Sequence, residues 1–424
     1  MAESKTYQGQ WWIPSDNEVP DSNLFAGTLT IDDDNSCLLS LTNAEPSGND
    51  PFEGIAVLWG KDRHGNIFSL YKLEINKWVL SDHVELKAKY VIIGVHLKSL
   101  DEPYFNECHA EFPYLQNWTN SSMQCLYHDF DKQEITIKYG KDIEYLKGEL
   151  KQDLRYRIVE NTACNLGREK FSAWKETQYQ IVSDKHLSIN VFNDYIREFA
   201  QFFSLAMYSK QQPSIIYFRR KEDNNSYKLF FVATQSKKPF STPLISLREM
   251  KDRLPSLIDN YHTVYDKIET LTRYLITSIN TGDFDAPIFI IVAQALEGYY
   301  QRFLKGTKGV NKRKWESLIK QYENIKAIND CNIDADVLKD TRDRYSHLYL
   351  DGSPKYQKAA KGSDLLMLTL KCKVLLTCCI LKQIGMTDDE INTCFDQSIV
   401  HFMVHTVKKY EKKKLVENTK EINS

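Results

Sequence analysis

The spacing of apolar residues changes character at about Pro243. Before that point, short runs rich in β-branched and aromatic residues alternate with clusters of Asp, Asn, Gly and Pro, which is typical of strands joined by turns. The clearest runs span residues 25–32, 37–43, 55–60, 67–75, 90–97 and 134–140. Their spacing predicts an antiparallel sandwich or an open barrel.

One helix is predicted within this β-rich part. Apolar residues recur at helical spacing over 188–208, and Ser188 is a favourable N-cap at the start. Strand character returns over 214–220 and 227–234, on either side of a turn-like segment. A helix followed by a hairpin is therefore expected before the change at Pro243.

After Pro243 the pattern is helical. An amphipathic helix is expected over 257–279, and another begins at Asp285, with Pro287 in its first turn, and ends near Gly306. Further helical stretches cover 314–325, 334–350 and 363–385. The last is almost wholly apolar, which predicts the central helix of a bundle of four or five helices.

These patterns predict an α+β fold with two domains: an N-terminal antiparallel β-rich domain, sandwich- or barrel-like, over 1–245 and a C-terminal α-helical bundle over 246–424. Composition agrees with a globular chain of 424 residues, of which 42% are hydrophobic and 26% charged. The net charge of −2 gives no global sign of a nucleic-acid binder, so any such surface is local.

Expectations about the cellular compartment and about cofactors come from sequence features that are absent. Nine cysteines without a CxxC pair favour reduced core thiols in a cytoplasmic protein. No signal peptide precedes the first strands, and the apolar run 286–296 is too short to span a bilayer, so no membrane partner is expected. His401 and His405 share a helix face but have no third ligand nearby, and 32–35 is most simply a turn. No metal or other cofactor is predicted.

Arg342 and His347 are the residue pair with catalytic potential. Arginine stays charged and binds phosphate oxygens through two donors, and histidine exchanges a proton near neutral pH. RNA is cleaved without a metal when a base takes the 2′-hydroxyl proton, that oxygen attacks the phosphorus, and a cation stabilises the phosphorane. DNA lacks the attacking hydroxyl. The pair therefore has the two functions that RNA cleavage requires.

The spacing of this pair leaves a structural alternative open. Five residues on a helix turn about 140° past a full circle, so the two side chains do not share a face. The helix-breaking Asp-Gly-Ser-Pro segment at 351–354 places His347 in the last turn, at a rim that Arg342 can reach. The alternative is a surface arginine and a C-terminal histidine that merely stabilises the helix dipole.

The stretch RDRYSHLY, 342–349, resembles the R-x4–6-H motif of HEPN-domain ribonucleases. The helix AQALEGYYQRF at 293–303 is similar to an early helix of ApeA-type HEPN domains. The segments 8–14, 25–31 and 93–118 resemble the ApeA N-terminal domain, with its Trp-Trp-Pro-like opening, Gly-x-His segment and later Leu-x-x-Trp. The resemblance covers both halves of the chain.

This resemblance implies an anti-phage abortive-infection protein whose HEPN half cleaves RNA without a metal. It also implies a homodimer, in which two motifs face one cleft and the second histidine supplies the acid. The resemblance implies that Arg342 binds phosphate and the transition state and that His347 transfers protons. At position 343, where the family commonly has Asn, this chain has Asp. Asp343 then orients Arg342 or His347, pairs with Arg344, or raises the pKa of His347. Tyr349 completes an R-x4-H-x-Y form, in which a partner enzyme can modify the tyrosine; core packing is the alternative.

A local RNA-binding surface is expected beside the motif. The segment 304–315 carries five cations around glycines, with Trp315 either available to stack on bases or buried. The five cations are Lys305, Lys308, Lys312, Arg313 and Lys314. The lysine-rich tail 408–424 is either a second phosphate-binding segment or a solvated helix end.

Three functions remain open from the sequence. The first is an endoribonuclease that is latent until a phage-derived trigger appears and then cleaves cellular RNA, with tRNA as a plausible target. The second is a non-catalytic HEPN module that binds RNA or protein, and the third is the toxin of a toxin–antitoxin pair.

Overall fold

The computed structural model describes most of the chain as two compact units, each of which is treated by itself below. The described residues are 4–14, 24–42, 54–80, 83–119, 126–129, 134–137, 143–166, 171–223, 225–232, 235–240, 242–281, 285–304, 311–348 and 356–422. The first unit consists of Met1–Gln116, Ser121–Arg197 and Gln212–Gln235, and the second of Asn117–Asn120, Glu198–Gln211 and Ser236–Ser424. The predicted division into 1–245 and 246–424 stays a prediction.

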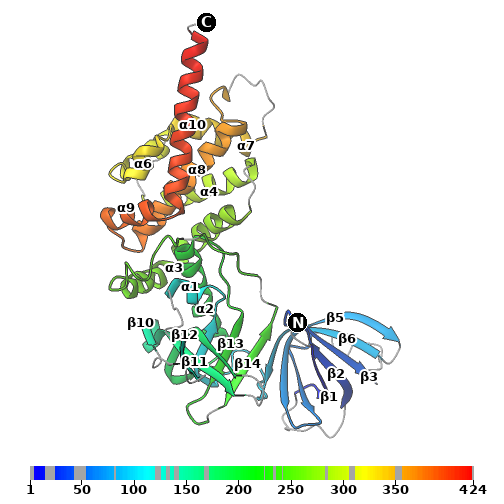
Figure 1. Ribbon diagram of the computed structural model, residues 1–424. Helices are drawn as coiled ribbons and strands as arrows, with labels where there is room; N and C mark the ends of the chain where they lie inside the picture. Colours follow the sequence, from blue (N-terminus) through cyan, green and yellow to red (C-terminus); the bar gives the residue numbers. More distant parts are fainter. Residues whose placement is uncertain are drawn as a thin grey trace. The chain divides into compact units, whose positions relative to one another are not determined.

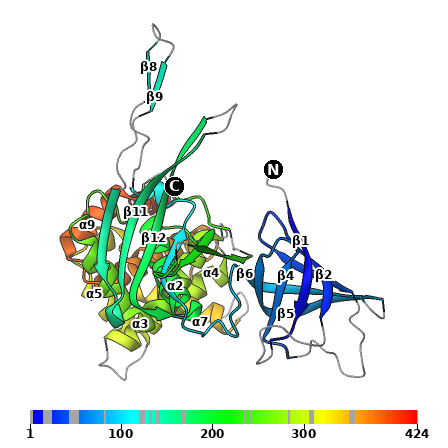
Figure 2. The ribbon, with the colours of Figure 1, turned by 90° about the horizontal axis from the view of Figure 1, so that it is seen from below.

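The first unit is built on antiparallel strands. Its long sheet has the order β10-β11-β12-β7-β13-β14-β6-β3-β2-β1-β4-β5, with β5 also paired to β6. The strands are β1 Lys5–Trp12, β2 Phe25–Ile31, β3 Cys37–Thr42, β4 Val57–Asp62, β5 Ile67–Leu80, β6 His83–Ile93, β7 Phe105–Glu111, β10 Ile143–Glu149, β11 Arg155–Leu166, β12 Phe171–Leu187, β13 Ile215–Arg219 and β14 Ser226–Phe231. A separate hairpin joins β8 Leu126–Asp129 to β9 Glu134–Ile137 (Figure 2).

Strands β1 to β6 close into a barrel, because β6 pairs with β3 at one end of the series and with β5 at the other. Buried and partly exposed positions alternate along β3, as the two-residue period of a strand requires. The buried residues of the six strands face one interior. The core of the barrel includes Trp11, which is fully buried in the same cluster as Leu29, Leu39 and Phe68. The barrel-like, β-rich N-terminal region predicted from the sequence is therefore confirmed.

Two helices accompany the strands, α1 Leu115–Thr119 and α2 Ile189–Met207. Ser188 caps α2 as predicted, since its hydroxyl accepts a hydrogen bond from the backbone N–H of Val191 at 3.3 Å. The helix begins in the first unit, and residues from Glu198 onward belong to the second. There Glu198 accepts from His262 at 2.5 Å, and the Tyr208 hydroxyl lies 3.0 Å from that of Thr377.

The second unit is a helical bundle whose central member is α8 (Figure 1). Cys372, Val374, Leu375 and Leu376 of α8 are fully buried, and the helix contacts α3, α4, α6 and α10, which confirms the predicted central position. The helices are α3 Leu254–Asn280, α4 Ala286–Phe303, α5 Asn311–Gln321, α6 Lys326–Cys331, α7 Ala335–Ser346, α8 Gly362–Gln383, α9 Asp388–Gln397 and α10 Ile399–Ile422. The prediction of four or five helices was too low, because α6, α9 and α10 add to the five predicted ones. Helices α6 and α9 are short, with 6 and 10 residues, and the second half of α10 is rich in lysine.

Helices α4 and α9 begin at residues that are favourable N-caps. Asp285 is the N-cap residue of α4. Thr387 caps α9 in a reciprocal capping box with Glu390, which satisfies backbone N–H groups that would otherwise lack a partner. Within the described residues, no helix is both long enough and apolar enough to cross a membrane.

The cysteines that the structure describes are buried free thiols. They are Cys37, Cys108, Cys331, Cys372, Cys378, Cys379 and Cys394. Burial raises the pKa of Cys37 and of Cys372 to about 12. These thiols are therefore protonated and unreactive at neutral pH, as the prediction of core thiols requires.

Candidate active site at the end of α7

Helix α7 carries the Arg-His pair and is fixed by its buried face. Asp334 caps its start by accepting hydrogen bonds from the backbone N–H groups of Asp336 and Val337. Leu338 and Thr341 are fully buried, and the Thr341 hydroxyl also accepts from the backbone N–H of Ala360 at 2.8 Å. This face orients the next residue, Arg342, toward α4, which α7 contacts.

Arg342 is held between two carboxylates. Its Nη2 donates to Oε2 of Glu297 on α4 at 3.0 Å, and its Nη1 donates to Oδ1 of Asp343 at 3.1 Å. Although burial disfavours the charged form, Glu297 and Asp343 together raise the pKa of the Arg342 guanidinium. The Nε atom is buried and, among the described residues, has no hydrogen-bond partner. A guanidinium has five N–H donors, so part of this fork stays available to a phosphate oxygen.

Charges around Arg342 nearly cancel. The ammonium of Lys339 lies 3.1 Å from Oδ1 of Asp340 and 3.7 Å from Oδ2 of Asp343. The hydrogen bond to Asp340 raises the pKa of Lys339, against a smaller opposing effect of burial. Two cations, Arg342 and Lys339, thus face three carboxylates. In this arrangement the site does not attract polyanions strongly.

His347 lies at the end of the helix, as predicted. It is the C-cap residue of α7, its backbone N–H donates to the carbonyl of Asp343 at 3.2 Å, and its side chain is exposed. Leu348 follows with a left-handed φ of +52° and is 85% exposed. The chain thus leaves the helix at Leu348, before the predicted breaker at 351–354, which lies outside the described residues.

The orienting role predicted for Asp343 stays a prediction, but its contacts are clear. The carboxylate pairs with Arg342 and Lys339. Glu297 and Lys339 were missed by the sequence analysis. Glu297 lies in the stretch 293–303 that resembles an early HEPN helix, but it is 45 positions from Arg342, so only the packing of α4 against α7 reveals its contact with the arginine.

The predicted RNA-binding segment is described only in part. Lys305 and Lys308 lie outside the described residues, and so does Tyr349; of Lys312 only the backbone is described. Arg313 is exposed and Lys314 is partly exposed, but both lie on α5, not in a loop. Trp315 is 1% exposed, so the structure contradicts the interpretation that it stacks on bases and supports the buried alternative.

Other candidate sites have structural explanations. Asn35 has a left-handed φ of +62°, and Asp34 accepts from the backbone N–H of Ser36 at 2.8 Å, so residues 32–35 form the predicted turn. Within the described part of the chain, no group of three or more His, Cys, Asp or Glu residues is arranged to hold a metal ion.

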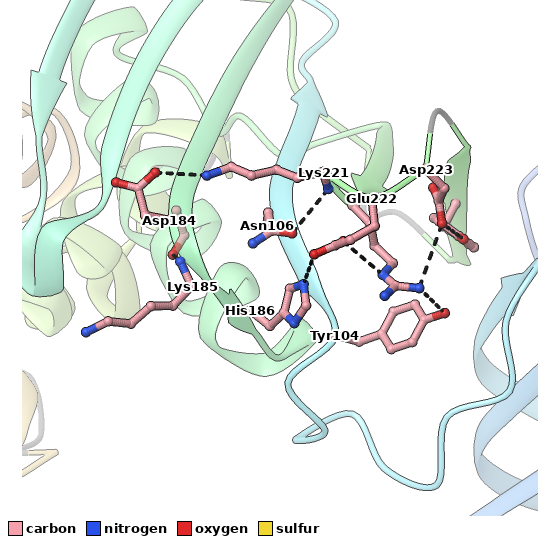
Figure 3. Close-up of polar contacts among 11 residues, drawn as sticks. Tyr104, Asn106, Asp184, Lys185, His186, Lys221, Glu222 and Asp223 are labelled. Carbon is pink, nitrogen blue, oxygen red and sulfur yellow. Dashed lines mark hydrogen bonds and ion pairs between the residues drawn. The ribbon is translucent and has the colours of Figure 1, made fainter.

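A charged cluster in the first unit links β7, β12 and the β13–β14 turn (Figure 3). Lys221 lies 2.8 Å from Asp184, and His186 lies 2.9 Å from Glu222. Arg220 donates to the Tyr104 hydroxyl at 2.9 Å and lies over the same ring. Opposite charges meet within the cluster, which fits a structural link between strands better than a catalytic centre.

Comparison with models of protein families identifies the family of this chain. A family model described as ApeA N-terminal domain 1 matches residues 6–261, which is more than half of the chain. This chain belongs to the ApeA-type HEPN family. A second model, described as Apea-like HEPN, matches residues 290–390 and so contains Glu297, Arg342 and His347 of the ApeA-type protein. No curated protein and no solved structure matches the chain.

Proposed function

We propose that this ApeA-type protein is a metal-independent endoribonuclease of anti-phage abortive infection. The observation that supports the proposal is the position of Arg342 and His347. Both lie at the C-terminal end of α7, within the part matched by the HEPN model, and His347 is exposed. The exposed imidazole stands five residues after a guanidinium with donors to spare, and these two groups fit the chemistry of RNA cleavage.

In the proposed reaction, His347 takes the proton of a ribose 2′-hydroxyl. The 2′-oxygen attacks the adjacent phosphorus, and Arg342 stabilises the negative charge of the phosphorane. The bond to the 5′-oxygen then breaks, and that oxygen takes a proton from an acid. The products are a 2′,3′-cyclic phosphate and a 5′-hydroxyl end.

A second copy of the chain supplies the acid in this proposal. One histidine cannot be base and acid in the same step, whereas a homodimer with two facing α7 ends offers two. Leu348, next to His347, is 85% exposed, and a large apolar side chain at such a position is suited to an interface. In this proposal the β-rich N-terminal part senses a phage-derived trigger. The substrate is cellular RNA, such as tRNA, so the protein would act in the cytoplasm.

The test is cleavage of total RNA by the purified protein in EDTA, with and without lysate from phage-infected cells as a source of the trigger. We expect His347→Ala and Arg342→Ala to abolish cleavage and the wild-type products to carry 2′,3′-cyclic phosphate ends. His186→Ala, which changes an exposed histidine of the first unit, is the matched control and should cleave normally. Equal cleavage by wild type and His347→Ala would show that the assignment is wrong. Sequencing of the RNA ends identifies the substrate.

One observation favours the non-catalytic alternative. Arg342 already pairs with Glu297 and Asp343, an arrangement that also suits a purely structural ion pair between α4 and α7. In that case RNA or a protein partner binds equally well to the Arg342→Ala/His347→Ala double variant, and no RNA is cut under any condition.

A further inference from the structure

A basic groove outside the α7 site is lined by residues of α6, α9 and α10. It has a volume of about 580 Å³, which is within the range of pockets that bind small ligands. Its floor is apolar and consists of Ala327, Phe395 and Val404, which are 8%, 1% and 7% exposed. None of these three helices contributes Arg342, Asp343 or Glu297, so the groove is separate from the candidate active site.

One face of α10 forms a cationic wall of this groove. His401, His405, Lys408, Lys409 and Lys412 all line it and all are exposed. The spacing of 4, 7, 8 and 11 residues from His401 is that of one face of a helix. These residues lie beyond position 390, where the HEPN match ends, so the family model does not account for them.

Two of the lysines in the groove are not neutralised. Lys326 pairs with Asp396 at 3.3 Å, and Lys408 pairs with Asp330 at 3.1 Å. Within the described part of the chain, neither Lys409 nor Lys412 forms an ion pair. They are one helical turn apart, which brings their Cβ atoms to about 5–6 Å and lets both ammonium groups reach the same phosphate. The groove therefore combines an apolar floor with uncompensated positive charge at one side.

We propose that this groove binds a phosphorylated nucleotide unit. The planar base would cover the apolar floor, Lys409 and Lys412 would hold the phosphate, and the Asp330 and Asp396 carboxylates would accept hydrogen bonds from base or ribose. A free nucleotide and a nucleotide within an RNA strand present this same chemistry. The proposal does not depend on cleavage, because binding to the groove requires neither Arg342 nor His347.

The test measures binding to the full-length His347→Ala protein, so that cleavage cannot interfere. The probes are ATP and a 5′-phosphorylated oligouridylate, studied by calorimetry and fluorescence anisotropy. EDTA is present throughout, so that a metal shared by His401 and His405 cannot bridge protein and phosphate. Lys409→Glu and Lys412→Glu change the groove. Lys413→Glu is the matched control, because it makes the same charge change on α10 at a position that does not line the groove.

We expect Lys409→Glu and Lys412→Glu each to weaken binding of at least one probe roughly tenfold, since a charged hydrogen bond is lost and repulsion is added. For RNA, the salt dependence of log K should also become shallower by about 0.7 per lost phosphate contact. Lys413→Glu should bind like the parent, and Lys409→Arg should retain affinity because it keeps the charge.

The two probes distinguish the source of the nucleotide. Loss of ATP binding in the groove variants identifies a free nucleotide, and a loss confined to the oligouridylate identifies an RNA strand. The proposal is wrong if neither probe binds the parent, or if Lys413→Glu weakens binding as much as the groove variants. Melting temperatures equal to that of the parent show that these exposed substitutions leave the fold intact.

Discussion

The Nη2 atom of Arg342 lies 3.0 Å from Oε2 of Glu297, so the guanidinium proposed to bind phosphate already holds a carboxylate from another helix. Glu297 is 19% and Arg342 is 22% exposed, which makes the pair partly shielded from solvent. An RNA phosphate must either share the arginine with this carboxylate or displace it. The Glu297 carboxylate would therefore compete with a phosphate of the proposed RNA substrate for Arg342.

Removing the charge of Glu297 should strengthen RNA binding. Glu297→Gln keeps the size of the side chain and a hydrogen-bond acceptor, but it leaves the site with one negative charge fewer beside Arg342. We expect the KM for RNA to fall severalfold and to depend more steeply on salt, because another phosphate contact becomes favourable. Kinetics across a series of salt concentrations measure both effects.

The control for this variant is Glu323→Gln, which removes an exposed carboxylate that does not contact Arg342. It should leave KM unchanged. If Glu297→Gln instead lowers kcat with no change in KM, Glu297 positions Arg342 for the transition state and does not compete with the substrate.

Arg342→Lys should fail to rescue catalysis although it keeps the positive charge. The ammonium of lysine is a point charge and cannot use two parallel donors on one phosphate, and it cannot span Glu297 and Asp343 as the guanidinium does. We expect kcat to fall at least about tenfold, which corresponds to the loss of one charged hydrogen bond. Cleavage at the wild-type rate would show that Arg342 contributes only charge.

Leu348→Asp should disrupt the proposed dimer. The side chain is 85% exposed and next to His347, so a dimer with facing α7 ends would bury it, and a charge there would oppose association. We expect sedimentation to show a shift toward monomer and cleavage to fall in parallel. Leu415→Asp changes a leucine of α10 that is 68% exposed and should do neither. A monomeric Leu348→Asp protein that still cleaves RNA would refute catalysis by two copies.

Lys373 in the central helix should make stability depend on pH. It is 3% exposed, its Nζ donates to the Ser278 carbonyl at 2.6 Å, and burial lowers its pKa from 10.5 to about 8. Between these two values the unfolded chain binds more protons than the folded one, so the contribution of Lys373 to stability increases as the pH rises. At pH 7 the buried charge costs about 3 kcal/mol.

Lys373→Met should therefore raise the free energy of unfolding at pH 7. The gain is about 2 kcal/mol, because losing the hydrogen bond to Ser278 offsets about 1 kcal/mol. The advantage should shrink as the pH rises from 8 toward 10.5 and the wild-type amine loses its proton. Urea unfolding at several pH values measures the difference, and a pH-independent gain would contradict the assignment.

Gly60→Ala should destabilise the barrel. A Cβ at this position would lie 2.1 Å from Cε3 of Trp11, which is fully buried. A contact this short forces the buried ring or the strand to shift, so overpacking should cost about 3 kcal/mol. Amide exchange of β1 and β4 should become faster. Gly298→Ala is the control: its Cβ would lie 3.5 Å from Leu271, an ordinary contact, and in a helix this change stabilises by about 1 kcal/mol.

The sequence alone predicted those features of the fold that depend on residues close together in the chain. Ser188 and Asp285 stand at the starts of helices as predicted, and the Ser188 hydroxyl accepts a hydrogen bond from a backbone N–H three residues away. The apolar run of α8 predicted a central helix, since such a segment is stable only when it is surrounded by others. The place of His347 at the end of α7 was also predicted correctly, although Leu348, and not the later breaker, marks the turn.

Relationships between distant segments were determined by tertiary structure alone. Three such relationships are the pairing of β3 with β6 that closes the barrel, the contact of Glu297 with Arg342, and the groove between α6 and α10. The burial of Trp315 was likewise decided only by packing. The sequence by itself indicated which residues have the side-chain chemistry that RNA cleavage would need, and it predicted the long helices and part of the strands. Only the packing of helix against helix decided that the arginine has a carboxylate partner, because side-chain contacts depend on which surfaces meet in space.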